Sequence, residues 1–187
     1  MSDKKHIVII GGTSGLGLAS AEYLLNQGYD VTVVGRKLPK ARADLSFYKM
    51  DVTDEESVKS FFCKDEISRI DGLIYSAGKS IGRKPINEFS NLEYIKIHDV
   101  NLLGALFVFK YCYEYLKQSK GKVVIINSIA ARTYSEFSGI EYTITKSALP
   151  GLVRHLSADW SKDSILINTI FPSMIETSML EERLSSE

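Results

Sequence analysis

The sequence has little cysteine, no net charge and no long apolar run. Cys63 and Cys112 are its only cysteines, so we expect neither a disulfide framework nor a cysteine pair that binds a metal. The 23 basic and 23 acidic residues cancel, which leaves no overall field to attract nucleic acid or an anionic membrane. The apolar run near the N-terminus ends in glycines, too early for a signal peptide, and no run approaches the ~20 residues of a membrane span. We therefore expect a soluble, cytoplasmic protein, with residues 1–187 in a single domain and no nucleic-acid or membrane partner.

Short runs rich in β-branched residues alternate with helix-like segments along the chain. Most of these runs are continuously apolar, which is typical of parallel strands covered on both faces. The predicted strands are residues 6–10, 30–35, 46–50, 72–76, 122–127 and 165–170. The predicted helices are residues 15–27, 53–63, 90–117 and 139–160, with a last one beginning near Thr177. This alternation predicts a doubly wound parallel α/β sheet, a Rossmann fold, with six recognisable strands.

Two of these helices begin with a capping-box pattern. Thr53 is followed three residues later by Glu56, and Ser90 is followed at the same spacing by Glu93. In such a box the first side chain accepts a hydrogen bond from a free N–H group of the first helical turn. The link between the second and third strands, residues 36–45, is too short for a full helix.

A glycine-rich turn joins the first predicted strand to the first helix. Four of its seven residues are glycines, more than a plain strand-to-helix turn needs. Glycines let the backbone turn tightly and approach a pyrophosphate, while the N–H groups and dipole of the next helix face the anion. The turn therefore predicts a dinucleotide site formed by Gly11, Thr13, Ser14, Gly15, Leu16 and Gly17.

The residues that follow the second strand indicate which dinucleotide binds. In nucleotide-binding folds of this type an acid at this point binds the adenosine ribose, but here Gly35 occupies the position. Arg36 and Lys37 come next. An acid would repel a 2′-phosphate, whereas a guanidinium can bind it with two hydrogen bonds. Surface cations are common, but their place after this strand favours NADP(H) over NAD(H).

The pattern Y-x-x-x-K occurs three times, and with ten tyrosines about one match is expected by chance. The matches are Tyr75/Lys79, Tyr113/Lys117 and Tyr142/Lys146. The first lies in a strand and the loop after it, and the second lies near the exposed end of a long helix. Tyr142 and Lys146 instead share one helix face, and Ser128 ends the preceding strand fourteen residues before the tyrosine.

This third match has the residue types that carbonyl chemistry requires. Hydride transfer to or from a carbonyl carbon must be matched by proton transfer at its oxygen. A free tyrosine has a pKa of about 10, too high for this task near neutrality. A lysine one helical turn away favours the phenolate and so lowers that pKa, while a serine hydroxyl can hydrogen-bond the same oxygen.

The spacing G-x-x-x-G-x-G, together with Ser128 and the Tyr142/Lys146 pair, resembles the short-chain dehydrogenase/reductase family. Further matches in the family's order run over residues 7–177. The resemblance implies an NADP(H)-dependent enzyme that interconverts a carbonyl and an alcohol on a small molecule. It makes Tyr142 the proton donor or acceptor, Lys146 its partner and the ligand of the nicotinamide ribose, and Ser128 the group that polarises the carbonyl. Asn101 resembles the asparagine that bends a helix and anchors a water beside the lysine.

The same resemblance assigns further cofactor contacts. These are Asp51 and Val52 at the adenine, Ser76, Ala77 and Gly78 after the fourth strand, and Ile175 and Thr177 at the nicotinamide carboxamide. The sequence departs from the family pattern at several points, among them Ile10 and Ser76, where the family has threonine and asparagine.

The family normally continues for several dozen residues beyond the last matched segment. We therefore expect the seventh strand to be absent, residues 165–170 to form a sheet edge, and the substrate pocket to be shallow and open. Arg132, Tyr134 and Glu136 are expected to make that pocket polar. The resemblance also implies a homodimer or homotetramer built on the long helices.

Two other functions remain open. The chain could be a non-catalytic nucleotide-binding or regulatory member of the same fold. The intact Ser128, Tyr142 and Lys146 favour the enzyme, because a binding module has no need of them. An epimerase or dehydratase of nucleotide sugars is disfavoured by the glycine spacing and by the chain length.

Overall fold

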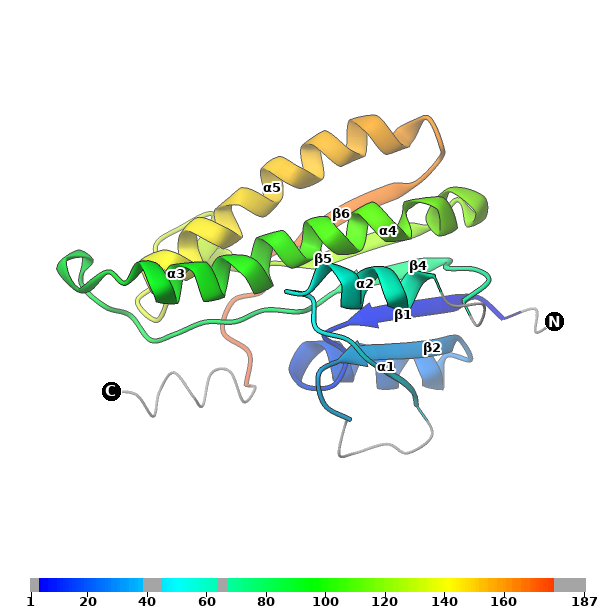
Figure 1. Cartoon of the computed structure of the whole chain (residues 1–187), viewed down its shortest axis with the longest axis horizontal. Helices are drawn as coiled ribbons and strands as arrows, with labels where there is room; N and C mark the ends of the chain where they lie inside the picture. The colour runs from blue at the N-terminus through cyan, green and yellow to red at the C-terminus, as the bar shows by residue number, and fades with distance from the viewer. Residues whose placement is uncertain (1–3, 39–44, 64–66, 177–187) are drawn as a thin grey trace.

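The computed structural model describes residues 4–38, 45–63 and 67–176, and its centre is a six-stranded parallel sheet (Figure 1). The strand order is β3-β2-β1-β4-β5-β6. The strands are β1 His6–Ile10, β2 Asp30–Gly35, β3 Ser46–Lys49, β4 Gly72–Tyr75, β5 Lys122–Ile126 and β6 Leu166–Ile170. Each lies within a residue or two of the predicted bounds. The order reverses between β1 and β4, so the doubly wound prediction is confirmed and a crevice is expected at this switch point.

Helices cover the two faces of the sheet unequally. The helices are α1 Gly15–Asn26, α2 Glu55–Phe62, α3 Asn91–His98, α4 Gly104–Ser119 and α5 Ile140–Ser161. In Figure 1, α2 and α4 lie in front of the sheet and α1 lies behind it. The front-face core combines strand residues such as Val8 and Ile125 with Phe61 of α2 and Phe109 of α4. None of the helices in the described part of the chain has both the length and the apolar character needed to cross a membrane.

The back-face core is smaller and leaves part of the sheet bare. It packs Ala21 of α1 against Ile9 and Val33 of the first two strands. On β6, Leu166 and Ile170 are 55% and 47% exposed. β6 is the edge of the sheet among the described residues, as predicted, and such an edge offers unpaired backbone groups to a neighbouring chain.

One of the two capping predictions is confirmed. The Ser90 side chain accepts a hydrogen bond from the Glu93 N–H group, as the second capping box predicted. The first box was placed one residue too early, because Asp54 caps α2 by accepting from the Glu56 N–H group. The Thr53 hydroxyl instead donates to the Asp51 carboxylate. Thr53 and Asp54 are adjacent and both can accept such a hydrogen bond, and the conformation of the preceding loop places Asp54 at the start of the helix.

The helix predicted over residues 90–117 is helical throughout, but a π-helical turn, η2 Asp99–Leu103, divides it into α3 and α4. The extra residue in this turn widens the helix where Asn101 faces inward. Short 3₁₀ turns at Ile86–Glu88 and Ile129–Ala131 complete the described elements. The predicted last helix near Thr177 lies outside the described residues, as does most of the link between β2 and β3.

Candidate functional site

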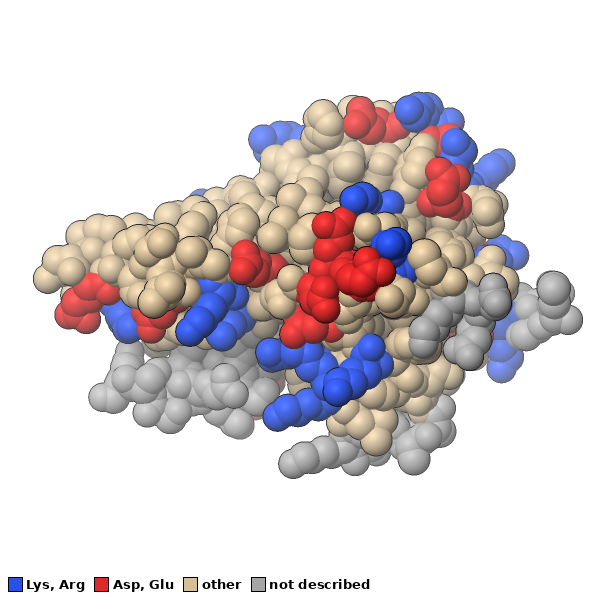
Figure 2. Space-filling view, viewed as in Figure 1, with Lys and Arg blue, Asp and Glu red and all other residues tan. Residues whose placement is uncertain are grey.

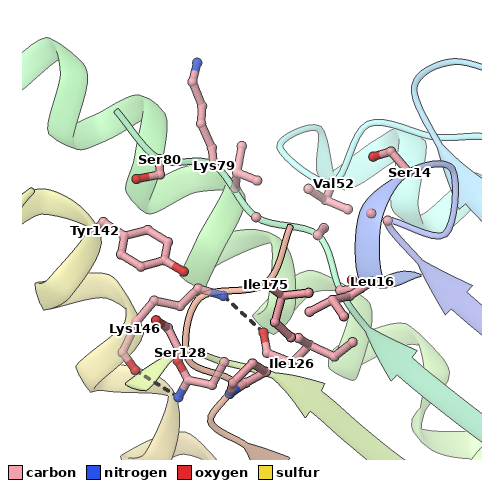
Figure 3. Close-up of a pocket in the computed structure, with 18 of the residues that line it drawn as sticks. Ser14, Leu16, Val52, Lys79, Ser80, Ile126, Ser128, Tyr142, Lys146 and Ile175 are labelled. Atoms are coloured by element: carbon pink, nitrogen blue, oxygen red, sulfur yellow. Dashed lines mark hydrogen bonds between the residues drawn. The ribbon is translucent and has the colours of Figure 1, made fainter. Parts of the chain in front are cut away.

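A cavity of about 470 Å³ opens along the carboxyl ends of the central strands. Gly11 and Ser14 of the glycine turn line one end, and Ser128, Tyr142 and Lys146 line the other. Figure 3 shows Ser14 and Val52 on one side of this space, with Tyr142 and Lys146 on the opposite side. The cavity lies at the switch point of the sheet, where ligands of open α/β folds bind.

The glycine turn is closely packed because its glycines have no side chains. Gly11 has a φ of +79°, a conformation that other residues rarely adopt, and its N–H group donates to the Val34 carbonyl at 2.8 Å. A Cβ on Gly11 would lie 2.5 Å from the Ala77 nitrogen, and one on Gly17 would overlap the Gly11 oxygen. These two glycines hold the turn against the segment after β4 and leave the backbone accessible from the cavity.

The N-terminus of α1 fits an anionic ligand. Ser14 occupies the cap position, but its side chain makes no capping hydrogen bond, and the first turn contains no acidic residue. The first N–H groups of an α-helix have no acceptor within the helix, and the helix dipole places partial positive charge there. Gly15 and Leu16 of this turn line the cavity. The arrangement can therefore hold a pyrophosphate.

The end of β2 forms the side wall of this part of the cavity. Gly35 and Arg36 line it, but Lys37 is not among the described lining residues. A Cβ at Gly35 would lie 2.8 Å from the Thr13 side chain, so an acid at this position would require the Thr13 side chain to shift. The Asp51 carboxylate accepts hydrogen bonds from the N–H group and hydroxyl of Thr53, at 3.0 and 2.8 Å.

Tyr142 and Lys146 are almost completely buried, with 5% and 4% of their surfaces exposed. Their polar ends point into the same space, close to Ser128 (Figure 3). The Lys146 ammonium lies 5.7 Å from the centre of the Tyr142 ring and donates to the Ile126 carbonyl at 3.1 Å. The Ser128 hydroxyl accepts from the Ala130 N–H group and keeps its own proton to donate. One turn of α5 and the end of β5 thus bring together a phenol, an ammonium and a hydroxyl.

Asn101 lies behind this site and does not line the cavity. Its side-chain oxygen accepts from the Lys79 N–H group at 2.7 Å, and its NH₂ group donates to the Lys79 carbonyl and to the Thr145 hydroxyl, each at 3.0 Å. The residue is fully buried. It therefore ties the π turn to the loop after β4 and to α5, one residue before Lys146. Its bond to a water remains a prediction.

The tyrosines of the other two Y-x-x-x-K matches have structural roles, although Lys79 of the first match lines the cavity. The Tyr75 hydroxyl donates to the Val100 carbonyl at 2.7 Å, and burial raises the pKa of this tyrosine. The Tyr113 hydroxyl donates to the Asp163 carboxylate at 2.5 Å, a bond that raises the pKa of Tyr113. Lys117 forms an ion pair with the same carboxylate at 3.3 Å. Neither tyrosine is among the described residues that line the cavity.

Most of the predicted site residues share this one cavity. They are Gly11, Thr13, Ser14, Gly15, Leu16, Arg36, Asp51, Val52, Ser76, Ala77, Gly78, Ser128, Tyr142, Lys146 and Ile175. Gly17, Lys37 and Asn101 are not in its described lining. Thr177 lies outside the described residues.

The polar residues expected in the substrate pocket were the wrong ones. The Arg132 guanidinium lies over the Phe171 ring, 3.7 Å from its centre, and Tyr134 is 70% exposed. Glu136 is exposed as well. Lining residues that the sequence did not assign to this end of the cavity include Lys79, Ser80, Ser135, Phe137 and Ser138. For Ser135, Phe137 and Ser138 the only available signal was their position between Ser128 and Tyr142, because an irregular loop has no period that predicts which side chains face inward.

Comparisons with known proteins show which family the chain belongs to. A model of the short chain dehydrogenase family matches residues 5–187. An L-fucose dehydrogenase of Oryctolagus cuniculus is 26% identical over 186 residues, which cover 95% of this chain and 65% of that protein. A tropinone reductase homolog of Arabidopsis thaliana is 31% identical over 197 residues, covering 98% of this chain and 74% of that protein.

Solved structures share the fold closely. The ligand-free aldohexose dehydrogenase of Thermoplasma acidophilum has a TM-score of 0.90 at 26% identity, covering 98% of this chain and 72% of that chain. ElxO with NADP bound has a TM-score of 0.88 at 30% identity, covering 98% of this chain and 79% of that chain. The family model spans nearly the whole sequence. The chain therefore belongs to the short-chain dehydrogenase family.

Proposed function

We propose that this chain is an NADP(H)-dependent oxidoreductase that interconverts a carbonyl and an alcohol on a small molecule, with all its site residues in one domain. The observation that carries the proposal is the shared cavity. Its glycine turn can hold a pyrophosphate at one end, and Tyr142, Lys146 and Ser128 meet at the other. A dinucleotide bound at the turn would therefore extend toward the only phenol–ammonium pair in the described lining.

The residues along the cavity fit the parts of NADP(H). The turn and the start of α1 hold the pyrophosphate, Arg36 binds the 2′-phosphate, and Asp51 and Val52 contact the adenine. Residues 76–78 line the path to the reacting end, where Ile175 would contact the carboxamide. When bound, the nicotinamide supplies or accepts the hydride. The structure of ElxO with NADP bound, at 30% identity, supports this choice of cofactor.

The proton is handled by residues of the chain itself. The Tyr142 hydroxyl gives its proton to the carbonyl oxygen during reduction and takes it back during oxidation. The Lys146 ammonium stabilises the phenolate that remains, and it binds the nicotinamide ribose. The Ser128 hydroxyl donates to the substrate oxygen and orients it. Asn101 holds the loop and helix that frame these groups, and anchors a water beside Lys146.

Replacement of Tyr142 tests the reaction. Tyr142→Phe removes one hydroxyl and keeps the ring, so we expect the fold and NADPH affinity to survive and turnover to fall ~10²–10⁴-fold. Lys146→Met should lower turnover and weaken NADPH, because it removes both the phenolate partner and the ribose contact. NADPH oxidation would be followed by absorbance against a panel of ketones, aldehydes and sugar derivatives.

Tyr113→Phe is the matched control, because this tyrosine has the same sequence pattern and lies outside the described lining. It should keep its turnover. Near-normal turnover of Tyr142→Phe, or an equal loss in folded Tyr113→Phe, would overturn the assignment. NADPH binding by the parent without turnover on any substrate would favour the non-catalytic alternative.

Arg36 tests the choice of cofactor. Arg36→Ala should weaken the binding of NADPH at least tenfold, as expected for a lost hydrogen bond to a charged group. The affinity for NADH should be nearly unchanged. Equal losses for the two cofactors, measured by fluorescence titration, would show that Arg36 does not contact the 2′-phosphate.

We further propose that the protein is cytoplasmic and forms a homodimer or homotetramer through α4 and α5. Leu106 of α4 and Leu152 and Trp160 of α5 line a shallow apolar groove between these helices. A second copy can bury this groove by helix packing. Sedimentation of Leu106→Glu should then show smaller particles than the parent, and a monomeric parent would contradict the proposal.

A further inference from the structure

The strand pairing places a second cation beside Arg36. β3 pairs with β2 in parallel, and Lys49 is in register with Gly35, the residue directly before Arg36. The pairing continues past this point, because the Met50 N–H group donates to the Gly35 carbonyl at 3.0 Å. Lys49 and Arg36 are thirteen positions apart in the sequence, yet they lie at the same corner of the sheet.

Lys49 leaves the sheet on the face where the glycine turn lies. Residues in register on neighbouring strands project to the same face, and the faces alternate along each strand. Phe47, two residues earlier, packs in the back-face core, whereas Met50 belongs to the front-face core. A Cβ on Gly35 would point at the Thr13 side chain, 2.8 Å away. Lys49 therefore projects on the same side as Thr13, one strand further out.

The corner is exposed and carries three basic side chains, of which only Arg36 is in the described lining of the cavity. Lys49, Arg36 and Lys37 are all exposed, and within the described ranges no carboxylate forms an ion pair with any of the three. Asp51, the acid closest to Lys49 in the chain, has its carboxylate engaged by Thr53. In Figure 2, basic side chains gather in the lower middle of the molecule, where Figure 1 places the end of β2.

We propose that Lys49 is a further specificity-determining cation for the 2′-phosphate of NADP(H), acting from β3 while Arg36 acts from the end of β2. The proposal rests on the proposed function, because it needs the adenosine ribose at this corner. A phosphate monoester carries about −1.5 to −2 charges at neutral pH, more than one guanidinium neutralises. The planar Arg36 group can bind two phosphate oxygens, and the flexible lysine adds a point charge from the other side. The preference for NADP(H) then depends on two strands rather than on one loop.

The test measures binding of two small probes to the full chain by calorimetry. 2′,5′-ADP carries the 2′-phosphate, and 5′-ADP does not. Lys49→Met should weaken the binding of 2′,5′-ADP about tenfold at low salt and leave the binding of 5′-ADP unchanged. The loss of affinity should become smaller at higher salt, because salt screens the charge. Lys49→Arg should restore most of the affinity. Lys122→Met is the matched control, because Lys122 is also an exposed strand lysine but begins β5 at the opposite end of the sheet.

The outcomes separate this inference from the proposed function. Equal weakening of both probes by Lys49→Met would mean that Lys49 supports the fold, and would overturn the inference. No effect of Lys49→Met while Arg36→Ala discriminates between the probes would overturn the inference and leave the NADP(H) assignment standing. If neither Lys49→Met nor Arg36→Ala changes the binding of one probe more than that of the other, both the proposed cofactor preference and the inference are overturned.

Discussion

Replacing Asn101 with alanine should destabilise the protein strongly, although the residue lies outside the cavity lining. The side chain is fully buried in the π turn and makes three hydrogen bonds, two to the Lys79 backbone and one to the Thr145 hydroxyl. Alanine has no group that can replace them. The Lys79 N–H group and carbonyl would lose their bonds to Asn101, while Thr145 would keep its bond to the Tyr142 carbonyl.

The size of the effect follows from these bonds. A buried hydrogen bond contributes about 1 kcal/mol net, and a buried group left without a partner costs about 1–3 kcal/mol. Three lost bonds therefore predict a loss of about 3–5 kcal/mol in the free energy of unfolding. Domains are stable by only about 5–15 kcal/mol. At about 2–4 °C per kcal/mol for a chain of this size, Tm should fall by roughly 10 °C.

Urea unfolding followed by circular dichroism would measure this loss. Asn91→Ala is the control, because Asn91 is exposed at the start of α3 and its change should stay within about 0.5 kcal/mol. Asn101→Asp should also destabilise, because a carboxylate oxygen would face the Lys79 carbonyl where the amide NH₂ now donates. A loss below about 1 kcal/mol for Asn101→Ala would refute the reasoning, since it would mean that water or a neighbouring group satisfies the freed atoms.

Three further predictions concern other parts of the molecule. The hydrogen bond from the Tyr113 hydroxyl holds the pKa of the Asp163 carboxyl below its usual value. This contact therefore stabilises the fold at pH values above the usual pKa of an aspartate, and the stabilisation is lost as the pH falls and the carboxylate is protonated. Thermal unfolding should therefore show the stability difference between the parent and Asp163→Asn shrinking below about pH 4. Gly11→Ala forces a Cβ against Ala77 at a positive φ, so it should lower Tm and abolish NADPH binding measured by fluorescence. Leu166→Lys adds a charge to the exposed edge strand, so sedimentation at high concentration should show less self-association than for the parent.

The strands, the glycine turn and most of the candidate site could be predicted from the sequence. The strands and turns formed by continuous β-branched runs and glycine clusters depend on interactions between near neighbours in the chain. The sequence pattern is therefore enough to predict them. The order of Gly11, Ser128, Tyr142 and Lys146 along alternating strands and helices then placed these residues at one edge of a parallel sheet. Even the departure at Gly35, with Arg36 after it, could be interpreted before any contact was known.

Contacts between distant segments decided the rest. The three Y-x-x-x-K matches are alike as patterns, and their contacts are seen only in the fold. The Tyr75 hydroxyl donates a hydrogen bond to the Val100 carbonyl and the Tyr113 hydroxyl donates one to Asp163, whereas Tyr142 faces the cavity. The loop before α5 has no period, so which of its side chains face inward depends on what packs against it. The register between β3 and β2 brings Lys49 beside Arg36. It depends on how the two strands pair with each other, and the sequence of either strand alone does not determine it. A sequence specifies which side chains are available, but which of them meet at one site is set by tertiary packing, because their encounter depends on elements far away in the chain.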